Sequence, residues 1–122
     1  MKTQNKIIGK LGEDLAAKLL QDKGYQIIER NWGSKWGEID IIAKKGEMYI
    51  FVEVKTKVGE NFGPPEQMVN YRKLQQIQRM ASTYAQAVNS AKRIDVVAIV
   101  LPSGSHPEGE EVQRIDHYEA VY

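Results

Sequence analysis

The chain has 122 residues, of which 42% are hydrophobic and 27% charged, so we expect one globular domain spanning residues 1–122 with a single core. It contains no cysteine, which excludes disulfides and thiolate metal sites. No apolar run approaches the roughly 20 residues that span a bilayer, and the start of the chain lacks a signal-peptide pattern. We therefore expect a cytoplasmic protein with no membrane partner. The net charge of +1 neither requires nor excludes a polyanionic partner.

Residues 3–23 are predicted to form a helix, because apolar residues recur there every three or four positions. Gly24 is the expected stop signal. Gly9 and Gly12 lie inside this helix, where each costs up to about 1 kcal/mol relative to alanine. That cost indicates either a close approach to another element or a frayed first turn. The pattern alone makes Glu13, beside this glycine pair, a solvated helix residue.

A strand is predicted over residues 25–31, followed by a turn over residues 32–37. The turn contains two tryptophans, Trp32 and Trp36. Aromatic side chains in a loop can stack on nucleic-acid bases. They can also cover one end of the core, and the sequence favours that second interpretation.

Residues 38–55 are predicted to form a hairpin of two strands joined at residues 44–47. One alternation phase is aliphatic and comprises Ile39, Ile41, Ala43, Ile50, Val52 and Val54. The other phase carries Asp40, Phe51, Glu53 and Lys55. An antiparallel register that places Asp40 opposite Phe51 or Glu53 gathers two carboxylates and an ammonium on one face of the sheet. A one-residue slip would separate them and expose a row of aliphatic side chains.

This grouping of polar residues suits a divalent metal. Mg²⁺ takes one or two carboxylates, keeps several waters and binds phosphate oxygens. A nearby lysine such as Lys55 can stabilise charge on a phosphate or hold an attacking water. In the alternative interpretation, Asp40 and Glu53 belong to a solvated face and form surface ion pairs worth about 0–1 kcal/mol each.

The remaining elements complete a predicted order of α-β-β-β-α-β-(β), which gives a mixed α/β sheet with helices packed on it. A loop over residues 56–65 could close over the polar face. A second helix is predicted over residues 66–89, a buried central strand over residues 93–101 and an edge strand over residues 112–118. Neither His106 nor His117 has a spacing that suggests a metal site, and both are interpreted as structural.

The second helix carries Arg72, Lys73 and Arg79 off its apolar stripe. Residues 67–94 include five basic side chains and no acidic one, whereas residues 108–119 carry five acids and one arginine. Such asymmetry can steer a polyanion to one side of a domain. The three basic helix residues are therefore either ordinary solvated side chains or contacts to phosphates.

The combination resembles the nucleases with a restriction-endonuclease-like core, the PD-(D/E)xK superfamily. Their motif is an acidic residue on one strand and an acid-x-lysine on the next, matched here by Asp40 and by residues 53–55. More closely, the chain resembles the small bacterial YraN-like family. The matching residues are Gly12-Glu13, Asn31, residues 37–43, residues 51–55, Phe62-Gly63 with Pro65, Lys73 and residues 93–97.

The resemblance implies a role for each matching position. Asp40 and Glu53 would be metal-binding carboxylates for Mg²⁺ or Mn²⁺, and Lys55 the catalytic lysine. Glu13 would be the helix acid that archaeal Holliday-junction resolvases bring to the same site. Lys57 fills the place of a second basic residue in the family motif. Junction resolvases of this fold tend to be dimers, so the resemblance also suggests a homodimer.

Two acidic residues, Glu60 and Glu66, depart from this pattern because they flank the expected phosphate entrance. The resemblance predicts a metal-dependent nuclease that hydrolyses DNA phosphodiester bonds, at branched or flapped structures. Lys57, Arg72, Lys73 and Arg79 are its candidate nucleic-acid contacts. The alternative is a non-catalytic nucleic-acid-binding or protein-interaction module on the same fold, since fold does not fix function.

Overall fold

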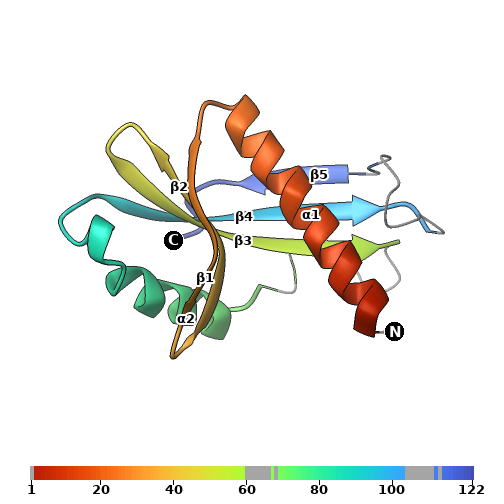
Figure 1. Ribbon diagram of the computed structural model, residues 1–122, viewed down its shortest axis with the longest axis horizontal. Coiled ribbons are helices and arrows are strands. Elements are labelled where there is room, and N and C mark those ends of the chain that lie inside the picture. Colours follow the sequence, from red (N-terminus) through yellow and green to blue (C-terminus); the bar gives the residue numbers. More distant parts are fainter. Residues whose placement is uncertain (1, 60–66, 68, 104–111, 113) are drawn as a thin grey trace.

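The computed structural model describes residues 2–59, 67, 69–103, 112 and 114–122, without the side chains of residues 2–4 (Figure 1). Its elements, in chain order, are α1 (Lys2–Asp22), β1 (Gln26–Ser34), β2 (Gly37–Lys45), β3 (Met48–Val58), α2 (Tyr71–Ser82), the 3₁₀ turn η2 (Ala85–Ala87), β4 (Lys92–Leu101) and β5 (Arg114–Tyr118). Neither α-helix is long and apolar enough to cross a membrane within the residues described.

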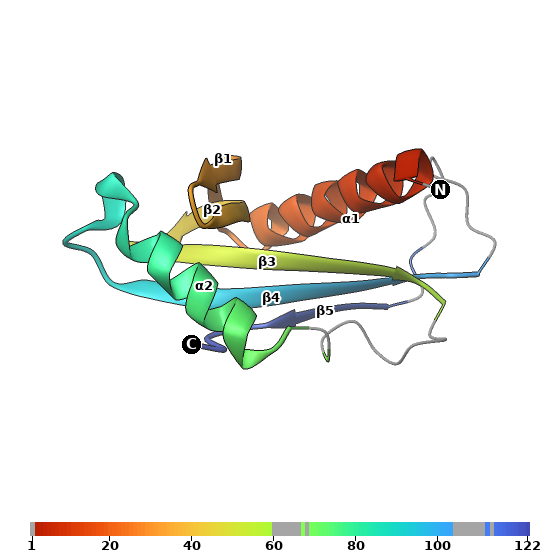
Figure 2. The same ribbon diagram turned by 90° about the horizontal axis from the view of Figure 1, so that it is seen from below.

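The strands form one open, mixed sheet in the order β1-β2-β3-β4-β5. β3 and β4 are parallel, and the other neighbours are antiparallel. The helices cover opposite faces, and in Figure 2 α1 lies above the strands while α2 crosses in front of them. β4 lies between β3 and β5 and is almost wholly buried, as its aliphatic run predicts. The predicted mixed α/β class and element order are confirmed.

Each helix packs on its own hydrophobic core. The core under α1 contains Ala16, Leu20, Tyr25, Ile41, Ala43, Ile50, Val52, Val97, Ile99 and Leu101, among others. The core under α2 contains Ile39, Ile42, Phe51, Ile77, Met80, Tyr84 and Ile94, among others. Because side chains alternate across a strand, residues 51, 53 and 55 of β3 face α2, whereas residues 52 and 54 face α1. The predicted polar face of the hairpin is therefore covered by a helix rather than by solvent.

The second helix is shorter than its apolar pattern predicts. Asn70 accepts a hydrogen bond from the Lys73 N–H (2.9 Å) and caps the first turn. At the other end the Thr83 hydroxyl donates to the Met80 carbonyl (2.7 Å), and the chain turns away. The prediction of residues 66–89 was therefore too long. Tyr84 lies beyond the end of the helix but packs in the core under α2, so the apolar pattern continues past that end.

Two strands are longer than predicted. β3 continues to Val58 because its parallel pairing with β4 continues to Leu101, so the predicted loop cannot begin at Thr56. The rest of that loop, including Glu60, lies outside the described residues. β1 continues to Ser34, which puts Trp32 in a strand opposite Ile39 and edge-on to Tyr84 at 5.2 Å. Trp32 packs at the core, as the sequence favours.

The hairpin register gathers the polar residues as predicted. Ile41 pairs with Val52, so one further step along both strands brings Asp40 opposite Glu53. Ile39, however, was wrongly placed in phase with Ile41. The pairing of β2 with β3 stops at Ile41, while its pairing with β1 continues, and Ile39 packs in the core under α2.

The close approach that Gly12 suggested is present. A Cβ at Gly12 would lie 1.8 Å from the Thr56 Oγ1, so only glycine lets α1 cross β3 at this distance. A Cβ at Gly9 would meet nothing within 4 Å. The crossing holds the middle of α1, where Glu13 lies, beside the hairpin.

Candidate functional site

Glu53 is the centre of the predicted site. It lies on β3 between the sheet and α2 and is only 4% exposed, which is unusual for an acid. The Lys55 and Lys73 ammonium nitrogens each lie 3.6 Å from its Oε2. Lys55 comes from the same strand and Lys73 from the first turn of α2. The structure thus joins Lys73 to the hairpin residues, although the sequence suggested only a phosphate contact for it.

Asp40 lies where β2 separates from β3. Its Oδ2 accepts a hydrogen bond from the Val54 N–H (2.8 Å), which occupies a backbone donor at the point where strand pairing stops. Burial, together with the negative charge and hydrogen bond of Glu53, raises the pKa of Asp40 to about 8, against the opposing effect of the Val54 N–H. The effect of Glu53 on this pKa shows that the two carboxyl groups interact directly.

Glu13 reaches the same region from α1. Its carboxylate accepts hydrogen bonds from the Arg30 Nε (3.2 Å) and the Asn31 Nδ2 (3.0 Å). The Asn31 Nδ2 also donates to Glu38 (3.1 Å). Asn31 has a φ of 55°, a left-handed conformation that asparagine tolerates better than most residues. The charge of Glu13 also contributes to the raised pKa of Asp40, so it acts at the edge of the site.

The chemistry of this group fits a hard divalent cation. Asp40, Glu53 and Glu13 offer only oxygen ligands, which Mg²⁺ and Mn²⁺ prefer. A cation beside Asp40 and Glu53 would relieve the repulsion that contributes to the raised pKa of Asp40. Lys55 and Lys73 would then be available to an anionic ligand on the same side of the sheet.

The other predicted nucleic-acid contacts are distributed around this group. Arg72 and Arg79 are exposed on α2 and line a neighbouring pocket with Trp36. Lys57 lies two residues beyond Lys55 on the same side of β3 and is partly buried. Their roles stay predictions.

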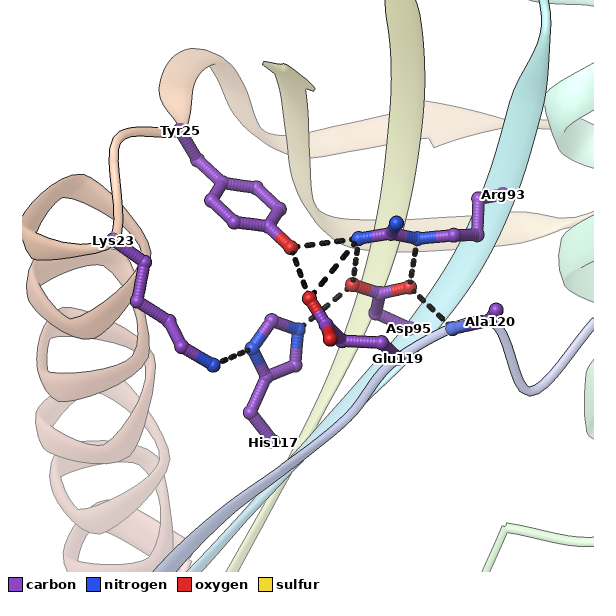
Figure 3. Close-up of polar contacts among 7 residues, drawn as sticks. All are labelled: Lys23, Tyr25, Arg93, Asp95, His117, Glu119 and Ala120. Atoms are coloured by element: carbon purple, nitrogen blue, oxygen red, sulfur yellow. Dashed lines mark hydrogen bonds and ion pairs between the residues drawn. The ribbon is translucent and has the colours of Figure 1, made fainter.

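A second polar cluster, on the opposite face of the sheet, was missed by the sequence analysis (Figure 3). The buried Asp95 accepts two hydrogen bonds from Arg93 (2.8 and 3.0 Å), one from the Ala120 N–H (2.9 Å) and one from the His117 Nε2 (2.7 Å). The Lys23 ammonium donates to the His117 Nδ1 (2.8 Å). Burial would raise the pKa of Asp95, but these hydrogen bonds outweigh it and lower the pKa.

Ligand atoms of Asp95, His117 and Glu119 lie within 4.8 Å of one another, so this cluster is also a possible metal site. The ligand atoms of this cluster already have hydrogen-bond or ion-pair partners, however. The Arg93 guanidinium and the Lys23 ammonium supply the positive charge that a metal would bring, and the Tyr25 hydroxyl donates to Glu119 (2.7 Å). The cluster joins β4 and the C-terminal segment to the α1–β1 connection. A ligand set with imidazole would favour Zn²⁺ rather than Mg²⁺.

No spacing in the sequence could have revealed this cluster, because Asp95 and His117 meet through the pairing of β4 with β5. The available signal was an acid, Asp95, inside an otherwise aliphatic run and two residues after Arg93. A charged residue in a buried strand requires partners.

Comparison with known proteins identifies the family. The model of the uncharacterised protein family UPF0102 matches residues 12–99. This chain belongs to the UPF0102 family. The YraN-like resemblance is thereby confirmed, and the match spans both the hairpin acids and Lys73.

Several UPF0102 proteins are similar over nearly their whole length. One from Rhodococcus opacus (strain B4) is 41% identical over 112 residues, covering 89% of this chain and 95% of the relative. One from Dictyoglomus turgidum is 42% identical over 109 residues, covering 87% and 89%. One from Syntrophus aciditrophicus (strain SB) is 40% identical over 124 residues, covering 98% and 94%.

Proposed function

We propose that this UPF0102 chain is a divalent-metal-dependent nuclease that hydrolyses DNA phosphodiester bonds, at branched or flapped structures. The observation that carries the proposal is the pair of carboxyls on Asp40 and Glu53 with the Lys55 ammonium 3.6 Å from the second. Their order on two adjacent strands matches the acid and acid-x-lysine motif of the restriction-endonuclease-like nucleases. We assign the fold to that group on the same grounds.

In this proposal Asp40 and Glu53 bind Mg²⁺ or Mn²⁺. When bound, the ion supplies a Lewis acid and an activated water. Lys55 orients the attacking water and stabilises the negative charge that develops on the phosphate. Lys73 neutralises Glu53 before substrate arrives and is free to contact a phosphate once the ion is present. Glu13, held by Arg30 and Asn31, accepts a hydrogen bond from water at the edge of the site.

A cytoplasmic location and a homodimer belong to the same proposal. A single domain of 122 residues offers little surface to a long substrate, and a second copy would provide a matching site for the other strand of a junction.

The alternative is a module that binds nucleic acid or protein without cleavage. One observation favours it: Lys55 and Lys73 both already pair with Glu53. If these lysines only neutralise the buried acid, the removal of Lys55 would leave nucleic-acid or protein binding unchanged. Such binding would not require a metal.

The two functions are separated by cleavage of end-labelled branched DNA in Mg²⁺ or Mn²⁺. We expect cleavage by the wild type and a loss of about 100-fold or more in Lys55→Ala, since removing a single group that stabilises transition-state charge has effects of this size. Lys18→Ala removes an equal charge from an exposed position of α1 and should cleave normally. Salt-dependent binding without cleavage, equal in both variants, would support the non-catalytic module instead.

A further inference from the structure

A polar pocket opens beside the carboxylate site, between α2 and the β1–β2 turn. Its volume is about 370 Å³, and it is lined by Trp36, Arg72, Gln75, Gln76 and Arg79. We propose that this pocket holds an unpaired nucleotide of the DNA strand whose phosphodiester lies at Asp40 and Glu53. The inference rests on the proposed function and adds the substrate feature that the site would recognise.

The Trp36 ring is held in place by the turn that carries it. The Gln76 side-chain amide donates a hydrogen bond to the Trp36 carbonyl, and the Trp36 N–H donates to the Ser34 Oγ (3.2 Å). Gly37 has a φ of 135°, and a Cβ there would lie 2.6 Å from the Gln76 Nε2. The turn therefore docks on α2 through backbone contacts. A side chain on such a fixed turn can bind a planar ligand with little loss of conformational entropy.

The lining groups have the chemistry of a nucleotide site. An aromatic ring provides a stacking surface for any base, and guanidinium groups bind phosphates or stack on bases. Two cations already lie near the ring: the Lys35 Nζ is 4.7 Å and the Arg79 Cζ 5.8 Å from its centre. Both belong to exposed, unbranched side chains that can move to phosphates when a base takes the ring. None of the lining residues is acidic.

The distance along α2 fits a strand that reaches both sites. Lys73 lies at the carboxylates, and Gln76 and Arg79 follow three and six residues later on the same helix. An α-helix rises 1.5 Å per residue, so the lining, which starts at Arg72 beside Lys73, extends along the axis to about 9 Å beyond Lys73. Stacked nucleotides of one strand are about 3.4 Å apart, so this span corresponds to roughly two or three nucleotides.

A volume of about 370 Å³ is too small for a segment of duplex but suits a base that has left the stack. An unpaired base costs no unpairing energy when it enters. The flapped or branched DNA expected from the family resemblance supplies such bases next to a strand junction. Recognition by Trp36 would therefore select DNA with unpaired nucleotides near the cleaved bond.

Equilibrium binding of dye-labelled oligothymidylate tests the pocket, with EDTA present so that the result does not depend on a metal or on cleavage. We expect Trp36→Ala to bind about 5- to 100-fold more weakly, the range that loss of one base–aromatic stack gives. Trp36→Phe keeps a stacking ring and should stay within about threefold of the wild type. Arg79→Gln should reduce the slope of log affinity against log salt by about 0.7. A blunt duplex should bind Trp36→Ala and the wild type equally.

Equal oligothymidylate affinities for the wild type and Trp36→Ala would overturn the inference. So would equal losses on single-stranded and duplex DNA, or the absence of any binding by the wild type at low salt. Arg79→Gln and Trp36→Phe keep the test decisive if Trp36→Ala does not fold. If Trp36-dependent binding is found but the wild type never cleaves DNA, the pocket stands and the nuclease proposal fails. If the wild type cleaves DNA but Trp36-dependent binding is absent, the nuclease proposal stands and the pocket inference fails.

Discussion

Asp40 is the residue whose protonation most directly reports the carboxylate pair. Its pKa rises from an ordinary value near 3.8 to about 8 on folding. A group with a raised folded pKa stabilises the fold below its unfolded pKa, and that contribution is lost as the pH rises through the folded pKa. Above pH 8, without metal, the folded protein must hold an ionised, largely desolvated Asp40 beside Glu53.

We therefore expect Asp40→Asn to unfold at a higher temperature than the wild type at pH 8–9 without metal. Its free energy of unfolding should be larger by on the order of a few kcal/mol. The difference should vanish as the pH falls below about 4, where Asp40 becomes protonated in the unfolded as well as the folded state. Thermal unfolding across this pH range, with EDTA, measures it. A variant that is less stable than the wild type at pH 9 would show that Asp40 is not repelled by Glu53.

Asp95 should respond in the opposite direction. Its pKa is lowered, so its contribution is present above the unfolded pKa and is lost as the pH falls through the folded pKa. Asp95→Asn weakens the pairing with Arg93 and His117, and breaking a buried ion pair costs about 3 kcal/mol or more. Denaturant unfolding should show that loss at pH 7 and a smaller one below about pH 4. A constant difference at both pH values would mean that the loss does not arise from ionisation.

At the scale of elements, the crossing of α1 over β3 is set by one glycine. Gly12→Ala would force α1 away from Thr56, and overpacking of this kind costs about 1–3 kcal/mol. Gly9→Ala meets open space and should stabilise the helix by up to about 1 kcal/mol. Urea unfolding of the two variants measures both effects. If Gly12→Ala is as stable as Gly9→Ala, the crossing is not close in solution.

The hairpin register was predictable because a slip would have exposed an aliphatic row, and β4 was predictable because residues 94–101 are aliphatic except for Asp95. The end of α2 was not, since Asn70 and Thr83 cap the helix within a continuous apolar pattern. The position of Ile39 depends on where β2 stops pairing with β3, which local alternation does not encode. At the site, the hairpin acids followed from register. The ion pair of Lys73 with Glu53 required the packing of α2 on the sheet.

At the scale of the whole molecule, the two faces of the sheet separate two polar groups. Glu53 lies opposite Val96, and Asp95 lies opposite Val52 on the adjacent strand, so the two acids are neighbours in register but point to opposite faces. The group at Asp40 and Glu53 has repelling carboxyls and only oxygen ligands. The group at Asp95 and His117 is already neutralised by Arg93 and Lys23. We therefore propose the divalent ion at the first group rather than the second.

The most direct test is calorimetric titration of Mn²⁺ into the wild type, Asp40→Asn, Glu53→Gln and His117→Ala at pH 7, with and without a short branched DNA. We expect the wild type and His117→Ala to bind Mn²⁺, and the two hairpin variants Asp40→Asn and Glu53→Gln not to bind it. Circular dichroism establishes that each variant is folded. Binding that survives in Asp40→Asn and Glu53→Gln but is lost in His117→Ala would place the ion at the second cluster. It would contradict the proposal that Asp40 and Glu53 bind the ion. So would the absence of binding by the wild type in both conditions.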